Sequence, residues 1–340
     1  LSADMSDLII INTCSVRITA ENRVLGRLGY YSALKKKRHF FVLLIGCMAE
    51  RLYEDIQKTY PLIDYVVGMF ERHLLPLIFE EIEKRFLEKD FRGEIKLLTD
   101  VDEKPTSGYY FAPFSYHEGS FQSFVPIMNG CNNFCTYCIV PYTRGREKSR
   151  SLDDVVKEVR KLASDGVIEV MLLGQNVNSF IDDEGNTFPA LVKEINKIEG
   201  LERIRFMTSN PKDLSDELID CYRTCEKLCK HIHLPVQSGS STVLKRMNRR
   251  YDRERYIDII DKLKDACPEI AITTDIIVGF PGETEEEFKE TLSLVEYVGY
   301  DSAFTFIYSP REGTPAAGFN DQIPYDIKHE RFERLNEVVN

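Results

Sequence analysis

Three cysteines, Cys131, Cys135 and Cys138, stand in a CxxxCxxC spacing directly after Gly130. Three thiolates can bind three irons of a 4Fe–4S cube, and the fourth iron then stays open to the amino and carboxylate groups of a small molecule. A closed ferredoxin cluster uses four cysteines, and structural zinc takes four ligands. The tight spacing therefore favours an open iron–sulfur cluster. The alternatives are three core cysteines, or a zinc site completed by a distant histidine.

Two further cysteines follow apolar, β-branched runs. Cys14 comes after the strand expected at 7–12, and Cys47 comes after the strand expected at 40–45. In a parallel sheet both would lie at the carboxyl edge, where ligands gather. Cysteines at strand ends are also common core residues, so the residues alone leave both interpretations open.

The remaining cysteines are expected in the core. Cys221, Cys225 and Cys229 are spaced by four, which would place them on one apolar face of a helix. Cysteine is among the most readily buried residues, and we interpret Cys267 in the same way.

Strands and helices alternate along both halves of the chain. The N-terminal half predicts strands at 7–12, 40–45 and 65–67, with helices at 20–37 and 50–58. The C-terminal half predicts six strand–helix units, with strands at 124–128, 168–173, 203–207, 231–235, 271–279 and 303–308. Helix N-termini with a capping-box pattern are expected at Ser151 and Thr284. This alternation predicts parallel α/β layers, the second forming a partial (β/α)6 barrel, with a doubly wound sheet as the alternative.

Composition limits the class of protein. The 340 residues have a net charge of -11, which argues against a surface that binds nucleic acid throughout. Basic residues gathered at 35–38, 144–150 and 245–255 could still form a local phosphate track. The longest apolar stretch is too short for a bilayer, and neither a leader nor a disulfide framework is indicated. We therefore expect a cytoplasmic enzyme with reduced thiols.

Longer motifs around the cysteines resemble a known family. The stretch NNFCTYCIVPYTRGRE at 132–147 resembles the signature of the methylthiotransferases in the radical S-adenosylmethionine (SAM) superfamily. LGQNVNSF at 173–180 and HIHLPVQSGS at 231–240 resemble its tRNA-modifying, MiaB-type branch. The resemblance covers nearly the whole chain. It implies an α/β protein with a flavodoxin-like parallel domain at 1–86 that lacks its first strand, a linker at 87–122, and a radical SAM partial TIM barrel at 123–340. The family's C-terminal TRAM domain is expected to lie outside this chain.

The same resemblance implies two 4Fe–4S clusters and SAM as cofactors. Cys131, Cys135 and Cys138 would hold the SAM-binding cluster, while Cys14 and Cys47 would hold an auxiliary cluster whose third ligand lies upstream. All five count as catalytic. The SAM contacts would come from successive strand ends, namely Gly174, Gln175, Asn176, Ser209, Gln237, Ser238, Asp275, Gly279 and Pro281.

The implied reaction inserts a methylthio group at C2 of N6-isopentenyladenosine at tRNA position 37. One SAM would donate the methyl group, and a second would supply a 5′-deoxyadenosyl radical. The implied partners of this monomer are the tRNA anticodon stem-loop, an electron donor such as flavodoxin or ferredoxin, and a sulfur donor. Two alternatives remain. The nearer is a methylthiotransferase for threonylcarbamoyladenosine tRNA or a ribosomal protein, and the more distant is a non-catalytic iron–sulfur module that binds RNA.

Overall fold

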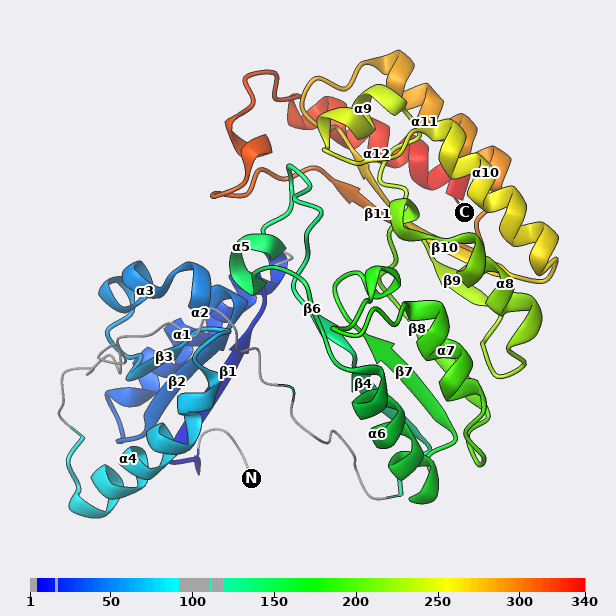
Figure 1. Cartoon of the computed structure of the whole chain (residues 1–340). Helices are drawn as coiled ribbons and strands as arrows, with labels where there is room; N and C mark the ends of the chain where they lie inside the picture. Colours follow the sequence, from blue (N-terminus) through cyan, green and yellow to red (C-terminus); the bar gives the residue numbers. More distant parts are fainter. Residues whose placement is uncertain (1–4, 16–17, 92–110, 112–118, 340) are drawn as a thin grey trace. The chain divides into compact units, whose positions relative to one another are not determined.

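The computed structural model describes residues 5–15, 18–91, 111 and 119–339 (Figure 1). These residues form two compact units, one assigned to 1–111 with 139–145 and the other to 112–138 with 146–340. The linker expected at 87–122 lies mostly outside the described residues. No helix in the described ranges is both long enough and apolar enough to span a membrane.

A parallel sheet in the order β1-β2-β3 forms the centre of the first unit. Its elements are β1 (Leu8–Thr13), α1 (Ile18–Lys35), β2 (Phe41–Gly46), α2 (Cys47–Arg51), α3 (Tyr53–Thr59), β3 (Tyr65–Val67), α4 (Leu75–Glu88) and α5 (Val140–Arg144). The single helix expected at 50–58 is wrong. The chain leaves helical geometry at Leu52, where φ is -105° and ψ is 16°, so Cys47 begins a separate short helix.

Helices cover both faces of this sheet. Val42 of β2 packs in one core with Leu28 of α1, and Leu43 packs in another core with Ile78 of α4. Because successive side chains of a strand point to opposite faces, a strand covered on both sides reads as a continuous apolar run. The sequence of β2 has this pattern.

Six parallel strands form the wall of the second unit. They are β4 (Gln122–Pro126), β7 (Glu169–Leu173), β8 (Arg203–Phe206), β9 (His231–His233), β10 (Ala271–Val278) and β11 (Ser302–Ile307). β4, β7 and β8 form one sheet, and β9, β10 and β11 form another. An isolated parallel bridge joins Ile204 of β8 to Leu228, in the segment that leads into β9. A short antiparallel pair, β5 (Met128–Asn129) with β6 (Lys148–Ser149), follows β4. The α/β prediction with parallel sheets is confirmed.

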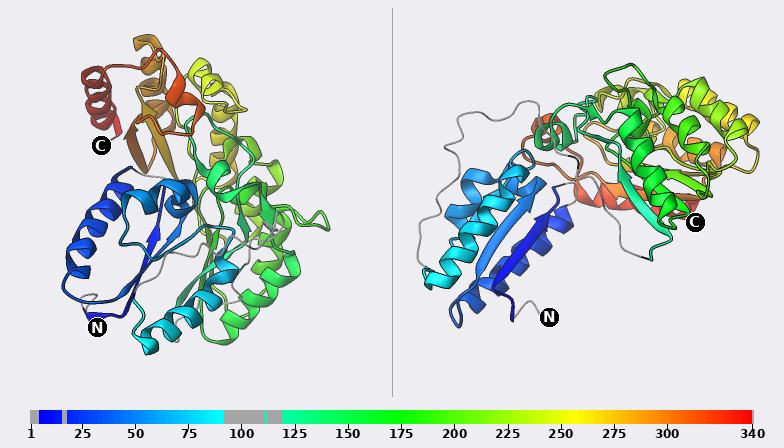
Figure 2. Two further views of the ribbon diagram at one scale, coloured as in Figure 1. Left: turned by 90° about the vertical axis from the view of Figure 1, so that its left-hand side faces the viewer. Right: turned by 60° about the horizontal axis from the view of Figure 1, so that its bottom comes forward.

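Helices alternate with these strands and pack against their outer face, as two further views show (Figure 2). They are α6 (Leu152–Ser164), α7 (Phe188–Asn196), α8 (Asp216–Thr224), α9 (Ser241–Arg246), α10 (Arg253–Ala266), α11 (Glu285–Val298) and α12 (Tyr325–Val339). The predicted capping box of α11 is confirmed, since Thr284 and Glu287 each accept from the other's backbone N–H. At α6 the Ser151 side chain accepts from the backbone N–H of Asp154.

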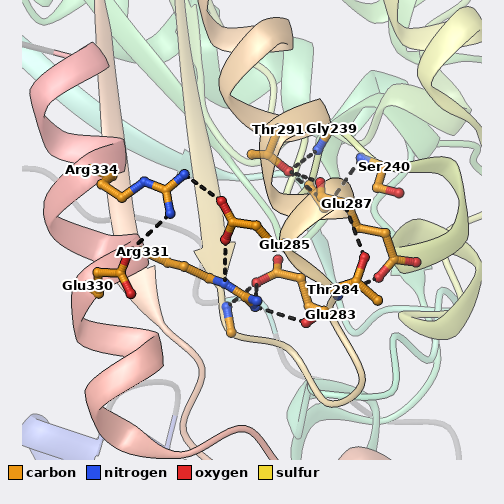
Figure 3. A network of polar contacts seen from close by, with 12 residues as sticks. Gly239, Ser240, Glu283, Thr284, Glu285, Glu287, Thr291, Glu330, Arg331 and Arg334 are labelled. Carbon is orange, nitrogen blue, oxygen red and sulfur yellow. Dashed lines mark hydrogen bonds and ion pairs between the residues drawn. The ribbon is translucent and has the colours of Figure 1, made fainter.

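Ion pairs hold the last helix, α12, against the turn after β10 and the first residue of α11 (Figure 3). Arg331 Nη1 donates to Glu283 Oε2 at 2.8 Å and to the backbone oxygen of the same residue at 2.9 Å. Arg334 Nη2 donates to Glu285 Oε1 at 2.6 Å. Burial raises the pKa of Glu283 to about 7, although the Gly279 N–H and Arg331 lower it. The carboxyl group therefore joins the end of β10 to α12 in a buried environment.

The cysteine stripe expected in the core is only partly correct. Cys221 and Cys225 are buried, as is Cys267. However, α8 ends at Thr224, so Cys225 is its C-cap and Cys229 lies beyond the helix and is half-buried. Spacing by four places residues on one face only as long as the helix continues.

Candidate active site

The CxxxCxxC loop of the second unit leaves the β5–β6 pair through two residues with positive φ. Gly130 has a φ of 82°, and its N–H donates to Gln175 Oε1 at 2.7 Å. Phe134 has a φ of 47°, which is uncommon for a residue with a side chain. The N–H of Cys138 donates to the backbone oxygen of Cys135 at 2.9 Å. These turns confine all three thiols to one short loop after β4.

The thiols of this loop lie in partly buried surroundings. Cys135 is buried, and Cys131 and Cys138 are half-buried. Burial raises the pKa of the Cys131 thiol, while hydrogen bonds from Asn133 lower it. Among the described residues, no three His, Cys, Asp or Glu side chains converge as metal ligands do. The fit to an iron–sulfur cluster therefore rests on the donor set and its hydrogen bonds.

At the ends of β7 and β8, two buried polar atoms have no hydrogen-bond partner among the residues that the structure describes. Asn176 Nδ2 donates to Asp213 Oδ2 at 2.7 Å, whereas Asn176 Oδ1 meets no hydrogen-bond partner within the described ranges. Ser209 Oγ is buried and also has no partner in the described part of the chain. Buried polar atoms are normally paired, so an unpaired one at a strand end calls for an explanation, such as a ligand. Gly174 leaves no room for a side chain, since a Cβ would lie 2.4 Å from Met128 Cγ.

Gln237 and Ser238, after β9, are already engaged with the protein. Gln237 has a φ of 70°, and its backbone N–H and C=O pair with Asp275 and Ile277 on β10. The Ser238 hydroxyl is fully buried, lies 3.3 Å from Thr291 Oγ1 and accepts from the N–H of Ser240 at 3.2 Å. This hydroxyl anchors the loop to α11.

Three of the predicted SAM contacts lie on β10 or in the turn that follows it. Asp275 Oδ2 lies 3.5 Å from His233 Nε2. Gly279 has a φ of 70°, and its N–H donates to Glu283 Oε2 at 2.8 Å. Pro281 is buried in the turn that follows. The backbone of this turn is therefore held by the same carboxyl group that binds α12.

A row of polar side chains on the strands was missed from sequence. Glu169 of β7 accepts from Gln122 Nε2 at 2.7 Å, from Arg203 Nε at 2.7 Å and from Arg205 Nε at 3.1 Å. Their positions alternate with buried apolar residues, for example Val170 after Glu169. That alternation was the available signal, because it marks a strand with one polar face.

The phosphate track expected from the three basic sets stays a prediction, although part of each set is engaged within its own unit. Several members make internal contacts: Lys35 with Asp64, Arg150 with Glu158, Arg246 with Glu287, Arg253 with Ser293 and Arg255 with Asp258. Most notably, Arg249 donates to Cys135 Sγ at 3.4 Å. Sequence spacing gives no sign of such partners, because Arg249 and Cys135 lie 114 positions apart. Lys245 and Arg250 remain exposed.

In the first unit, strand register brings Cys14 and Cys47 to one sheet edge. Thr13, the last residue of β1, has Gly46, the last residue of β2, as its partner. Cys14 and Cys47 follow directly, the first exposed and the second buried. Neighbouring strands lie about 4.8 Å apart, so the two residues leave the sheet side by side.

Comparison with known proteins agrees with this arrangement. The family model described as "Radical SAM superfamily" matches residues 125–295, and that described as "Uncharacterized protein family UPF0004" matches residues 2–68. A tRNA-2-methylthio-N(6)-dimethylallyladenosine synthase of Treponema denticola is 58% identical over 99% of this chain and 76% of its own length. Its counterpart in Clostridium botulinum strain Langeland is 52% identical over 98% of this chain and 73% of its own length.

Solved structures agree in fold. The radical SAM methyltransferase TsrM from Kitasatospora setae, with cobalamin and a [4Fe-4S] cluster bound, has a TM-score of 0.65 and 14% identity over 92% of this chain and 66% of its own. The cobalamin-dependent radical SAM enzyme OxsB has a TM-score of 0.56 and 14% identity over 98% of this chain and 48% of its own. The chain belongs to the radical SAM superfamily and, within it, to the family of the tRNA-2-methylthio-N(6)-dimethylallyladenosine synthases.

Proposed function

We propose that this chain inserts a methylthio group at C2 of N6-isopentenyladenosine at position 37 of tRNA, with one SAM as methyl donor and a second as radical source. The observation that carries the proposal is the CxxxCxxC loop at the carboxyl end of β4. It shares that edge of the strands with Asn176 Oδ1 and Ser209 Oγ, for which the described residues provide no hydrogen-bond partner. A cluster with an open iron needs a ligand held at such an edge.

Different residues of the second unit would bind the radical cluster and SAM. Cys131, Cys135 and Cys138 would bind three irons of the radical cluster. Asn176 and Ser209 would satisfy polar groups of SAM, and Gly174 would allow a close approach of the backbone. When bound, cluster and SAM together supply reductive cleavage of the sulfonium, which is the cofactor's own chemistry.

The first unit would hold the sulfur to be inserted. Cys14 and Cys47 would supply two thiolates to the auxiliary cluster from neighbouring strand ends. An electron donor such as flavodoxin or ferredoxin and a sulfur donor complete the reaction. The enzyme would act as a cytoplasmic monomer on the anticodon stem-loop, where the target base lies in a single-stranded loop and no duplex must open.

The experiment combines metal analysis with product analysis. A protein that carries the upstream third ligand of the auxiliary cluster together with this sequence is reconstituted anaerobically and incubated with dithionite, SAM and tRNA that carries N6-isopentenyladenosine. We expect about eight irons per chain, corresponding to two 4Fe–4S clusters. Mass spectrometry should detect 5′-deoxyadenosine and the methylthiolated nucleoside. Cys135→Ala should abolish both products, while Cys267→Ala, in the buried core, should keep them.

Each alternative has its own outcome. Methylthio product only on threonylcarbamoyladenosine tRNA, or only on a ribosomal protein, would contradict the proposed substrate. SAM cleavage with about four irons and no methylthio product would contradict the auxiliary site at Cys14 and Cys47. Zinc in place of iron, with no SAM cleavage, would indicate the non-catalytic RNA-binding module.

A further inference from the structure

The guanidinium group of Arg249 is fixed by three different acceptors in the second unit. Nη1 donates to Cys135 Sγ at 3.4 Å, Nη2 donates to the backbone oxygen of Pro235 at 2.9 Å, and Nε donates to Tyr251 Oη at 3.0 Å. Tyr251 in turn donates to the backbone oxygen of Val236 at 2.8 Å. A planar guanidinium group that donates from each of its three nitrogens is held in one orientation. In this orientation the positive charge of Arg249 lies against the Cys135 sulfur.

The residues before Arg249 bind the backbone of the same cysteine loop. Asn248, with a φ of 58°, donates from Nδ2 to the backbone oxygen of Phe134 at 2.9 Å. The backbone N–H of Thr136 donates to the backbone oxygen of Met247 at 3.1 Å. The Thr136 hydroxyl donates to the backbone oxygen of Arg246 at 3.0 Å. The contact of Arg249 with Cys135 is therefore part of a continuous clamp that the segment 246–249 forms on the loop.

The effect of this cation on a cluster has a definite sign. Reduction adds one negative charge to a cluster, and a fixed positive charge nearby stabilises the reduced form more than the oxidised form. Hydrogen bonds to cluster sulfurs are among the features that set the reduction potential of iron–sulfur proteins. Cys135 is buried, so water screens the interaction weakly.

We propose that Arg249 is a positioning residue that holds the Cys135 sulfur and raises the reduction potential of the cluster bound there. The inference rests on the proposed function through one point, namely that Cys135 is a cluster ligand. An easier reduction would favour electron transfer to the cluster before SAM cleavage. Arg249 thus belongs to the cluster environment rather than to a surface for RNA.

The test is a redox titration followed by electron paramagnetic resonance. Cys14 and Cys47 are both replaced by Ala in every sample, so that the signal comes from the radical cluster alone. Arg249→Met and Arg249→Gln remove the charge, and both should shift the midpoint potential to more negative values at unchanged iron content. Arg249→Lys keeps the charge and should lie between these variants and the parent. The matched control is Arg250→Met, which removes an exposed cation at the next position and should leave the potential unchanged.

A midpoint potential equal to that of the parent in both neutral variants would overturn the proposal. If Arg249→Met loses its iron, the midpoint potential of Arg249→Gln alone decides, because the Gln amide keeps a hydrogen-bond donor that can preserve the loop. A parent protein that binds no cluster at all would contradict the proposed function instead. The two failures are therefore distinguishable in one set of samples.

Discussion

Thr13 and Gly46 face each other at the ends of two parallel strands, so Cys14 and Cys47 leave the sheet at the same edge. Thr13 Oγ1 accepts from the backbone N–H groups of Met48 and Ala49, at 3.1 and 3.3 Å. These bonds fix the first turn of α2 against the end of β1. The first unit thus places both cysteines at one edge of its sheet, although they are 33 positions apart in the sequence.

Replacing Cys14 or Cys47 should separate SAM cleavage from methylthiolation of the tRNA. In Cys14→Ala or Cys47→Ala we expect SAM cleavage to persist while the methylthiolated nucleoside disappears, because only the auxiliary cluster loses a ligand. The iron content should fall by about four per chain. Iron analysis, 5′-deoxyadenosine and tRNA nucleosides are measured on the same samples. Intact methylthio product in Cys14→Ala would refute the assignment, and Cys267→Ala controls for loss of a thiol elsewhere.

Gly46 should tolerate no side chain. Its φ is 99°, and a Cβ would lie 2.4 Å from the backbone oxygen of Thr13. A strained backbone of this kind costs about 1–3 kcal/mol, so Gly46→Ala should lower the free energy of unfolding by at least that order. Urea denaturation of the metal-free protein measures the change.

The control is Gly26→Ala within α1, where an added Cβ would meet nothing within 4 Å in the described residues apart from the backbone of its own helix. A helix-interior Gly→Ala change should stabilise the protein by up to about 1 kcal/mol. Equal effects at Gly46 and Gly26 would show that the close approach at Thr13 does not matter. Gly46→Ala should also reduce iron bound by Cys14 and Cys47, since it disturbs the edge that both residues leave.

Local sequence patterns predicted most helices and strands well, but they did not predict contacts between residues far apart in the sequence. The strand at 65–67 and the capping box at Thr284 depend on neighbouring residues, and both are confirmed. The break at Leu52 and the end of α8 at Thr224 were not predicted from the local sequence pattern. The contact of Arg249 with Cys135 spans 114 positions. The charge run at 245–255 therefore gave no sign that Arg249 contacts a cysteine of the CxxxCxxC loop.

Two serines at strand ends should respond differently to the same change. Ser209 Oγ has no hydrogen-bond partner among the described residues, so Ser209→Ala should leave stability unchanged and weaken SAM binding about tenfold, the effect of one lost hydrogen bond. Ser238 bonds to Thr291 and Ser240, so Ser238→Ala should lower stability and leave SAM affinity near that of the parent. Calorimetric titration with SAM and thermal unfolding separate the two effects. Unchanged affinity in Ser209→Ala would remove it from the cofactor site.

Glu283 should make the stability of the second unit depend on pH. Burial raises its pKa from 4.5 to about 7, despite the Gly279 N–H and Arg331. Between pH 4.5 and 7 the Glu283 carboxyl group is therefore protonated in the folded state and ionised in the unfolded state. Its stabilising contribution is fully present below pH 4.5 and is lost as the pH rises through 7. Glu283→Gln cannot titrate, so the parent should lose about 2 kcal/mol more than this variant between pH 5 and 8.

Urea denaturation at both pH values measures the difference, and Glu285→Gln provides the matched control. The hydrogen bond from Arg334 lowers the pKa of Glu285, so its contribution is present above the unfolded pKa and is lost only as the pH falls below about 4.5. Between pH 5 and 8 the Glu285→Gln variant should therefore follow the parent. Parallel profiles for the parent and Glu283→Gln would mean that Arg331 keeps Glu283 ionised, and the link between β10 and α12 would then be an ordinary ion pair at every pH tested.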